Sequence, residues 1–109
     1  MPRRLAAVKL PEQSEGDFQD SLLKLLKLNG WPEELIYHTF DSRRSRAGFP
    51  DIVAVKPTDG RLLIAELKRN STTLSSEQSV WIEALKLVRH FDVRVWRPRD
   101  MDEIVRTIR

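Results

Sequence analysis

The chain has 109 residues, a formal net charge of +3, no cysteine and two histidines. This length suits one domain with a single core, and no apolar run approaches the roughly 20 residues of a membrane span, so we expect no membrane partner. The lack of cysteine excludes disulfides and thiolate zinc sites, and a bound metal is therefore expected to have oxygen ligands, as magnesium and manganese do.

The N-terminal stretch "MPRRLAAVKLPEQ" is basic and lacks the long apolar core of a secretory signal. We expect residues 1–13 to be a basic N-terminal arm and residues 14–109 to be a single domain. The domain is predicted to open with a helix that begins at Ser14, a residue type that caps helices, and ends before Gly30. Apolar residues at helical spacing predict the buried face of this helix, namely Phe18, Leu22 and Leu25.

The remaining elements alternate between strands and helices. A second helix is predicted, with Trp81, Leu85 and Val88 on one face, and a final helix is predicted to be capped by Asp100 with Glu103 three residues on. The order α-β-β-β-α-β-α predicts an α/β fold with a mixed central sheet flanked by helices. The predicted strands are 35–40, 51–55, 61–69 and 92–98, with Asp59-Gly60 as a hairpin signal, and the two later helices are 75–90 and 99–109.

Charged residues occupy the predicted hairpin where apolar residues would be expected. Side chains alternate along a strand, so Glu66 and Lys68 share a face, and the preceding strand brings Asp51 near them. Two close carboxylates repel each other unless a cation lies between them, and a hard divalent ion suits oxygen ligands. The alternative is structural: Glu66 and Lys68 form an ion pair, and Asp51 caps the turn after Pro50.

The same residues carry a family resemblance. Pro50-Asp51 followed by Glu66-Leu67-Lys68 resembles the signature of PD-(D/E)XK nucleases, whose fold is a restriction-endonuclease-like core. The strings "GFPD", "AELKR", "LSSEQSVWIEAL" and "VWRP" together resemble the VRR-NUC branch, the virus-type replication-repair nuclease domain, from about Ser14 to the C-terminus.

This resemblance implies an endonuclease that hydrolyses DNA phosphodiester bonds with Mg²⁺ or Mn²⁺. Members of the branch often act on branched DNA, and stand-alone members resemble Holliday junction resolvases that work as dimers. The expected partners are therefore four-way junction DNA and a second copy of the chain. The expected setting is DNA repair or recombination in the cytoplasm of a bacterium or a phage-infected host.

Site residues follow from the resemblance, position by position. Asp51 and Glu66 would bind the metal with the backbone carbonyl of Leu67, and Lys68 would be the catalytic lysine. The family also has a glutamine on the following helix, which is Gln78 here.

Two of the predicted site residues have competing explanations. Gln78 lies three residues after Ser75, the spacing of a capping box, so it can cap the helix, reach the site, or do both. An acid from the first helix is also expected, and we prefer Glu15 to Asp17 because Glu15 follows the apolar stripe. Both acids would also be favoured at a helix N-terminus by the helix dipole alone.

A basic segment precedes the predicted site. Arg43, Arg44 and Arg46 come just before Gly48, and we expect the arginines to contact DNA phosphates without reading sequence, while Gly48 allows a tight turn near the substrate. The alternative is an ordinary solvated loop. Other functions stay open: a nuclease for flaps, nicks or ends, a non-catalytic DNA-binding module, or a structural protein.

Overall fold

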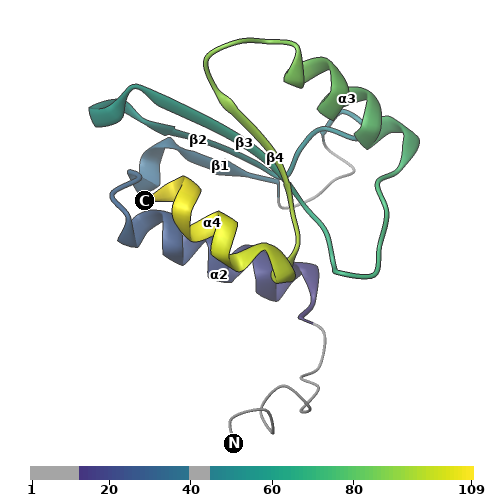
Figure 1. Cartoon of the computed structure of the whole chain (residues 1–109), viewed down its shortest axis with the longest axis horizontal. Coiled ribbons are helices and arrows are strands. Elements are labelled where there is room, and N and C mark those ends of the chain that lie inside the picture. Colours follow the sequence, from purple (N-terminus) through teal and green to yellow (C-terminus); the bar gives the residue numbers. More distant parts are fainter. Residues whose placement is uncertain (1–12, 40–44) are drawn as a thin grey trace, which may run out of the picture.

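The structure is a computed structural model that describes residues 13–39 and 45–109 (Figure 1). Within these ranges the α-helices and strands follow the predicted order. The predicted arm, except for Gln13, lies outside the described residues, as do Arg43 and Arg44. The elements are α2 (Glu15–Leu28), β1 (Ile36–His38), β2 (Ile52–Lys56), β3 (Arg61–Leu67), α3 (Ser76–Lys86), β4 (Asp92–Trp96) and α4 (Met101–Ile108), with the 3-10 turns η1 (Glu33–Leu35), η3 (Pro57–Asp59) and η4 (Pro98–Asp100).

The four strands form one mixed sheet in the order β1-β2-β3-β4. β1 pairs with β2 and β2 with β3 in antiparallel fashion, whereas β3 and β4 are parallel and are joined through α3. The predicted mixed sheet is therefore confirmed. In β3 the side chains of Leu63, Ala65 and Leu67 face α2 and α4, so those of Ile64 and Glu66 face the opposite side.

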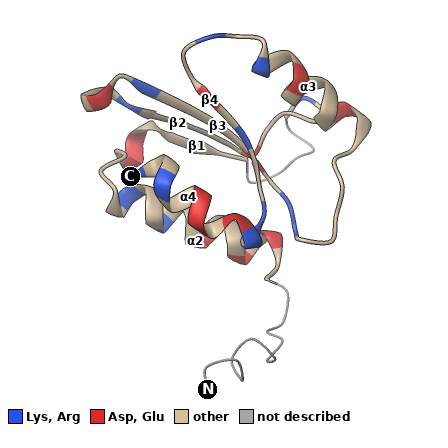
Figure 2. Ribbon diagram, viewed as in Figure 1, with Lys and Arg blue, Asp and Glu red and all other residues tan. Residues whose placement is uncertain are grey.

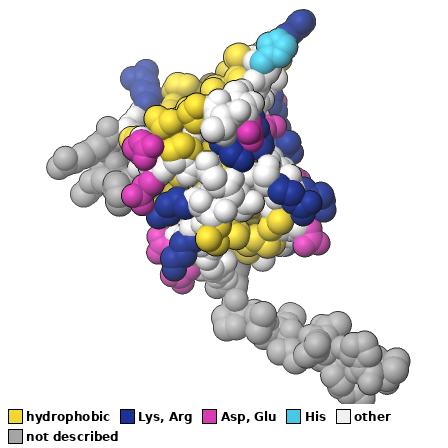
Figure 3. Space-filling view, turned by 90° about the vertical axis from the view of Figure 1, so that its left-hand side faces the viewer, with side chains coloured by type: hydrophobic (Ala, Val, Ile, Leu, Met, Phe, Trp, Pro, Cys, Tyr) yellow, Lys and Arg dark blue, Asp and Glu magenta, His cyan; other side chains and the backbone are white. Residues whose placement is uncertain are grey.

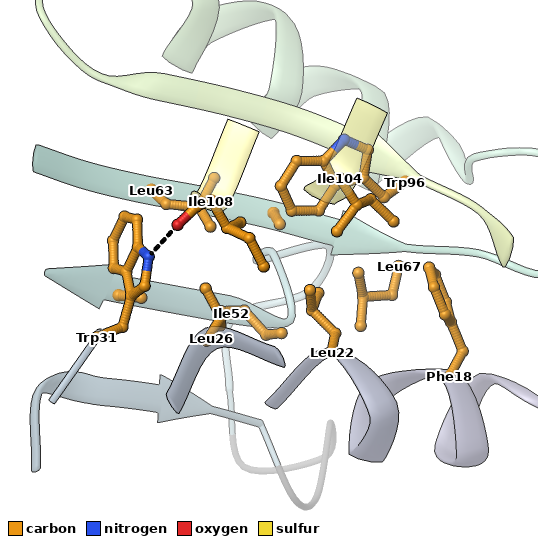
Figure 4. Packing of buried hydrophobic residues seen from close by; sticks show 12 residues of the cluster. Phe18, Leu22, Leu26, Trp31, Ile52, Leu63, Leu67, Trp96, Ile104 and Ile108 are labelled. Carbon is orange, nitrogen blue, oxygen red and sulfur yellow. Dashed lines mark hydrogen bonds between the residues drawn. The ribbon is translucent and has the colours of Figure 1, made fainter. Parts of the chain in front are cut away.

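The main core lies between the sheet and the pair of helices α2 and α4 (Figures 1 and 4). Ser14 caps α2 as predicted, because its side chain accepts a hydrogen bond from the amide of Asp17 at 3.0 Å. The buried residues on α2 are Phe18, Leu22 and Leu26; Leu25, predicted in the stripe, lies at the edge of the core.

The end of α4 is tied to the rest of the core. The indole nitrogen of Trp31 donates to the carbonyl of Ile108 at 2.9 Å (Figure 4). The guanidinium of Arg61 lies over the Trp31 ring and donates to the carbonyls of Thr107 and Arg109. These donors satisfy carbonyls that a helix end otherwise leaves without a partner.

The opposite face of the sheet is covered only in part. α3 lies against it near Glu66, where Ile82 is buried. Farther away, Tyr37 on β1 is 56% exposed and Val55 on β2 is 36% exposed. Figure 3 shows hydrophobic side chains at the surface on the side from which the β2–β3 hairpin projects. No helix within 13–39 and 45–109 is long and apolar enough to cross a membrane.

Several predicted boundaries are wrong for local reasons. The first strand is shorter than predicted because Leu35 belongs to η1 and the strand ends at His38. The hairpin connection, by contrast, lies where Asp59-Gly60 indicated it: it is the 3-10 turn η3, and Gly60 caps it with φ +65. The second helix ends at Lys86, so Val88 lies outside it and is 56% exposed.

The capping box predicted at the start of the last helix is also wrong. The carboxylate of Asp100 accepts from the amide of Arg97 at 2.8 Å, within the turn that precedes α4. The carboxylate of Glu103 accepts from the indole nitrogen of Trp96 at 2.7 Å. Both side chains are therefore engaged elsewhere, because η4 precedes the helix and a buried indole requires an acceptor.

Candidate active site

Asp51 and Glu66 meet at the end of the β2–β3 hairpin. The last antiparallel pair on this side joins Ile52 to Ala65, so the amide of Leu67 lies beyond the ladder. Asp51 Oδ2 accepts from that amide at 2.9 Å, and its carbonyl accepts from the amide of Thr39 at 3.0 Å. Asp51 is thus fixed through both its backbone and its side chain.

The surroundings of Asp51 and Glu66 disfavour the ionised form of both carboxyl groups. Glu66 is 2% exposed, and its burial, together with the charge of Asp51, raises its pKa to about 8. Burial also raises the pKa of Asp51, while the Leu67 amide opposes this change. The charge of Glu15 raises both pKa values and that of Lys68 lowers both, so these two predicted residues lie close to the pair.

The arrangement fits a divalent cation. Glu66 Oε1 is buried and has no hydrogen-bond partner among the residues described. A cation would satisfy this oxygen and remove the repulsion between the two acids. The described part of the chain has no group of three or more His, Cys, Asp or Glu side chains that could hold a metal. Further ligands would therefore be a backbone carbonyl such as that of Leu67, water, or substrate oxygens, a shell that Mg²⁺ accepts.

Gln78 takes both of the roles considered for it. Its side-chain oxygen accepts from the amide of Ser75 at 2.8 Å, and Ser75 Oγ accepts from the amide of Gln78 at 3.1 Å, which completes the capping box. Its side-chain nitrogen donates to Glu66 Oε2 at 2.9 Å. Gln78 therefore links the start of α3 to the acidic pair.

The segment before Asp51 is packed against the start of α3. Gly48 has φ +81, and a Cβ there would lie 2.4 Å from the carbonyl carbon of Glu77. The rings of Phe49 and Trp81 pack edge to face, 5.1 Å apart, and the indole nitrogen of Trp81 donates to the carbonyl of Ala47 at 3.2 Å. Gly48 lies in a tight turn, as predicted, because the amide of Phe49 donates to the carbonyl of Arg46 at 3.0 Å, and this turn packs on α3.

The basic residues near the pair are only partly described. Lys68 comes directly after β3 and is half-buried, and its amide donates to the carbonyl of Trp96 at 2.9 Å. Figure 2 shows basic residues where the chain leaves β3. Arg46 is exposed, and its carbonyl accepts from the amide of Phe49 in the turn that contains Gly48.

A family model decides which proteins this chain belongs with. The model of the VRR-NUC domain matches residues 4–100. The chain belongs to the VRR-NUC family. Membership implies a nuclease-type function, with DNA as the expected substrate of such a domain. A comparison of this VRR-NUC chain with curated proteins gives no match.

A solved structure has the same fold. It is described as a "VRR_NUC domain protein", has 18% sequence identity to this VRR-NUC domain, and superposes with a TM-score of 0.65. The match covers 91% of this chain and 88% of that chain. At this identity the likeness concerns the fold.

Sequence reasoning missed part of what surrounds the site of this VRR-NUC domain. Trp81 was placed on the apolar face of the second helix, and it is half-buried there and holds the segment before Asp51. An indole N–H near the surface needs an acceptor, which was the available signal. The side-chain nitrogen of Gln19 on α2 lies 3.2 Å from His38 Nδ1 on β1, a contact between elements that a sequence pattern does not predict.

Proposed function

We propose that this VRR-NUC domain is a Mg²⁺- or Mn²⁺-dependent endodeoxyribonuclease with a PD-(D/E)XK core of the restriction-endonuclease type, acting on branched DNA such as a four-way junction. One observation carries the proposal: the half-buried Asp51 and the buried Glu66 form an acidic pair beside Lys68, and Glu66 Oε1 has no partner in the described residues. Such a site is poorly suited to a protein without a cation, since two close carboxylates repel each other.

Each residue near the pair has a distinct part in the proposal. Asp51, Glu66 and the Leu67 carbonyl hold the cation, which when bound makes an attacking water more acidic and stabilises charge on the phosphate. Lys68 orients or helps to deprotonate the attacking water, or contacts the scissile phosphate. Glu15 contributes further negative charge from the start of α2.

Contacts to DNA are proposed for the basic segment before the site. Arg43, Arg44 and Arg46 hold the phosphate backbone as it passes, and such contacts position a duplex without reading its sequence. Gly48 keeps this segment close to α3 and therefore close to Gln78. We place the activity in repair or recombination in the cytoplasm of a bacterium or a phage-infected host.

The direct test is cleavage of labelled DNA. We expect the chain to cut a four-way junction in Mg²⁺ or Mn²⁺, and Lys68→Ala to lower the rate by about 10²–10⁴-fold, in the range of a lost proton-transfer group. Lys24→Ala, which changes an exposed lysine on α2, is the matched control and is expected to keep the rate.

The substrate panel separates the alternatives. If junction, flap, nicked and linear duplex DNA are cut equally, the proposed nuclease activity is supported and the proposed preference for junctions is wrong. Salt-sensitive DNA binding without cutting in either ion would indicate a non-catalytic DNA-binding module. Cutting by Lys68→Ala at the wild-type rate would contradict the proposed site.

We further propose that two copies act together, because a two-fold dimer presents two sites to a roughly symmetric junction. An exposed apolar stripe along α3 and its C-cap residue Leu87 supports this. Val80 is 69% exposed and Leu87 is 85% exposed, with the small Ala84 between them. The exposed Glu77 lies at the start of the helix and the exposed Arg89 just beyond its end, so two antiparallel copies of α3 would bring unlike charges together.

A charge exchange tests this pairing. Leu87→Glu is expected to shift the chain from dimer to monomer, because the buried carboxylate would lack a partner. Adding Val80→Lys should restore part of the dimer, since positions 80 and 87 face each other across an antiparallel pair. Light scattering after size exclusion measures the mass, with Leu28→Glu, at an 82% exposed position on α2, as the control. If the wild-type chain is a monomer both with and without DNA, the proposed dimer is wrong.

A further inference from the structure

The amide of Gln78 is held at both ends by groups that differ in character. The Ser75 backbone N–H can only donate, and it lies 2.8 Å from the amide oxygen. Glu66 Oε2 accepts a hydrogen bond from the amide nitrogen at 2.9 Å. A rotated amide would place its NH₂ against the Ser75 N–H and its oxygen against the Glu66 carboxylate. The Ser75 N–H therefore determines which end of the amide faces Glu66.

This orientation makes the two oxygens of Glu66 unequal. Oε2 accepts from Gln78, whereas Oε1 is buried and lacks a hydrogen-bond partner in residues 13–39 and 45–109. We infer that Ser75 is a positioning residue: its backbone N–H, acting through Gln78, keeps Oε2 engaged, presents Oε1 alone to a cation, and so favours Mg²⁺ over Ca²⁺. This inference rests on the metal-dependent function proposed above.

The preference for Mg²⁺ over Ca²⁺ follows from the number and arrangement of oxygen ligands that each ion binds. Ca²⁺ takes six to eight oxygens and often uses both oxygens of one carboxylate, whereas Mg²⁺ takes six ligands and usually keeps several waters. A carboxylate with one oxygen already engaged in a hydrogen bond is better suited to the smaller ion. Partners that orient a metal ligand in this way affect affinity strongly.

Ser75 is itself held in place by the β3–α3 connection. Arg97 donates from its guanidinium to the carbonyl of Thr72 at 2.9 Å, and Asn70 Oδ1 accepts from the amide of Arg99 at 3.1 Å. On the other side, Gly48 packs against the backbone of Glu77 and Gln78. The capping box is therefore fixed relative to the sheet that carries Glu66.

Two substitutions at one position isolate the backbone N–H. Ser75→Ala removes the hydroxyl and keeps the N–H, whereas Ser75→Pro removes both. Proline suits the backbone here because Ser75 has φ −70. Ser76→Pro places proline at the first helical position, where it is well tolerated, and controls for proline as such.

The readout is the affinity of the full chain for Mg²⁺, Mn²⁺ and Ca²⁺, measured by calorimetry without DNA. We expect Ser75→Pro to lower the ratio of Mg²⁺ to Ca²⁺ affinity about tenfold, with Ser75→Ala and Ser76→Pro close to wild type. Gln78→Met, which removes the amide, should change the ratio in the same direction and serves if the proline variant does not fold. A wild-type ratio in folded Ser75→Pro, or in Gln78→Met, would overturn the inference.

A measurement without cation tests the orientation itself. The side-chain NH₂ of Gln78 should give NMR signals shifted away from those of a solvent-exposed glutamine in wild type and in Ser75→Ala, and signals close to those of a solvent-exposed glutamine in Ser75→Pro. Signals in wild type at the positions of a solvent-exposed glutamine would overturn the inference. If the ordered signals are present but no cation binds to wild type, the proposed metal-dependent function fails and the inferred selectivity fails with it. If cations bind and Ser75→Pro keeps the wild-type ratio, only the inference fails.

Discussion

Gly48→Ala is expected to lower both stability and DNA cleavage. A Cβ at this position would lie 2.4, 2.6 and 2.7 Å from backbone atoms of Glu77 and Gln78, which cannot move aside as a flexible side chain can. The positive φ of +81 adds backbone strain. Together these effects should cost about 2–5 kcal/mol, measured by urea unfolding. Cleavage should fall further than stability explains, because the displaced atoms include the amide nitrogen of Gln78.

Gly16→Ala is the matched control for this prediction. No described atom lies within 4 Å of a Cβ added at Gly16, and the residue belongs to α2. Alanine should therefore stabilise the chain by roughly 0.5–1 kcal/mol and leave cleavage unchanged. If Gly48→Ala unfolds at the wild-type urea concentration, the packing of Gly48 on α3 is wrong.

The second large effect is a loss of stability as the pH rises without a divalent cation. Glu66 has its pKa raised from 4.5 to about 8, because it is buried beside Asp51. Between these values the folded state binds the proton that the unfolded state has released, so the slope of stability against pH is negative there. The stabilisation is complete below pH 4.5 and is lost as the pH approaches 8.

Glu66→Gln isolates this contribution. We expect the melting temperature of wild type to fall relative to that of Glu66→Gln as the pH rises from 5 to about 8, and Mg²⁺ to raise the wild-type value most at the upper end. Glu83→Gln, at an exposed position on α3, should keep the wild-type dependence. Parallel curves for wild type and Glu66→Gln would show that Glu66 is not the buried acid responsible.

Local patterns predicted the strands of the site well. The alternation of Leu63, Ala65 and Leu67 with Ile64 and Glu66 follows from strand geometry alone, and it placed Glu66 on the face that α3 covers. The spacing of Ser75 and Gln78 likewise predicted the capping box. Such features depend on neighbours in the sequence, so one sequence is enough to read them.

Contacts between segments that are far apart in the sequence could not be predicted from these local patterns. The packing of Gly48 on α3 depends on how the chain returns after the β2–β3 hairpin. Glu103 had the spacing of a capping residue, but the indole of Trp96 competes for its carboxylate. His90 adopts φ +73, which a sequence rule reserves for glycine, and it lies where the chain turns from α3 toward β4.

The place of the acidic pair in the hairpin has a consequence for folding kinetics. The connection between β2 and β3 closes the hairpin at one end, and Asp51 and Glu66 meet beyond the last pair at the other, between Ile52 and Ala65. Strand pairing that starts at the local turn would bring the acids together last. Their repulsion would then be absent from the folding transition state, so a proton or a cation at this site would chiefly slow unfolding and leave the folding rate almost unchanged.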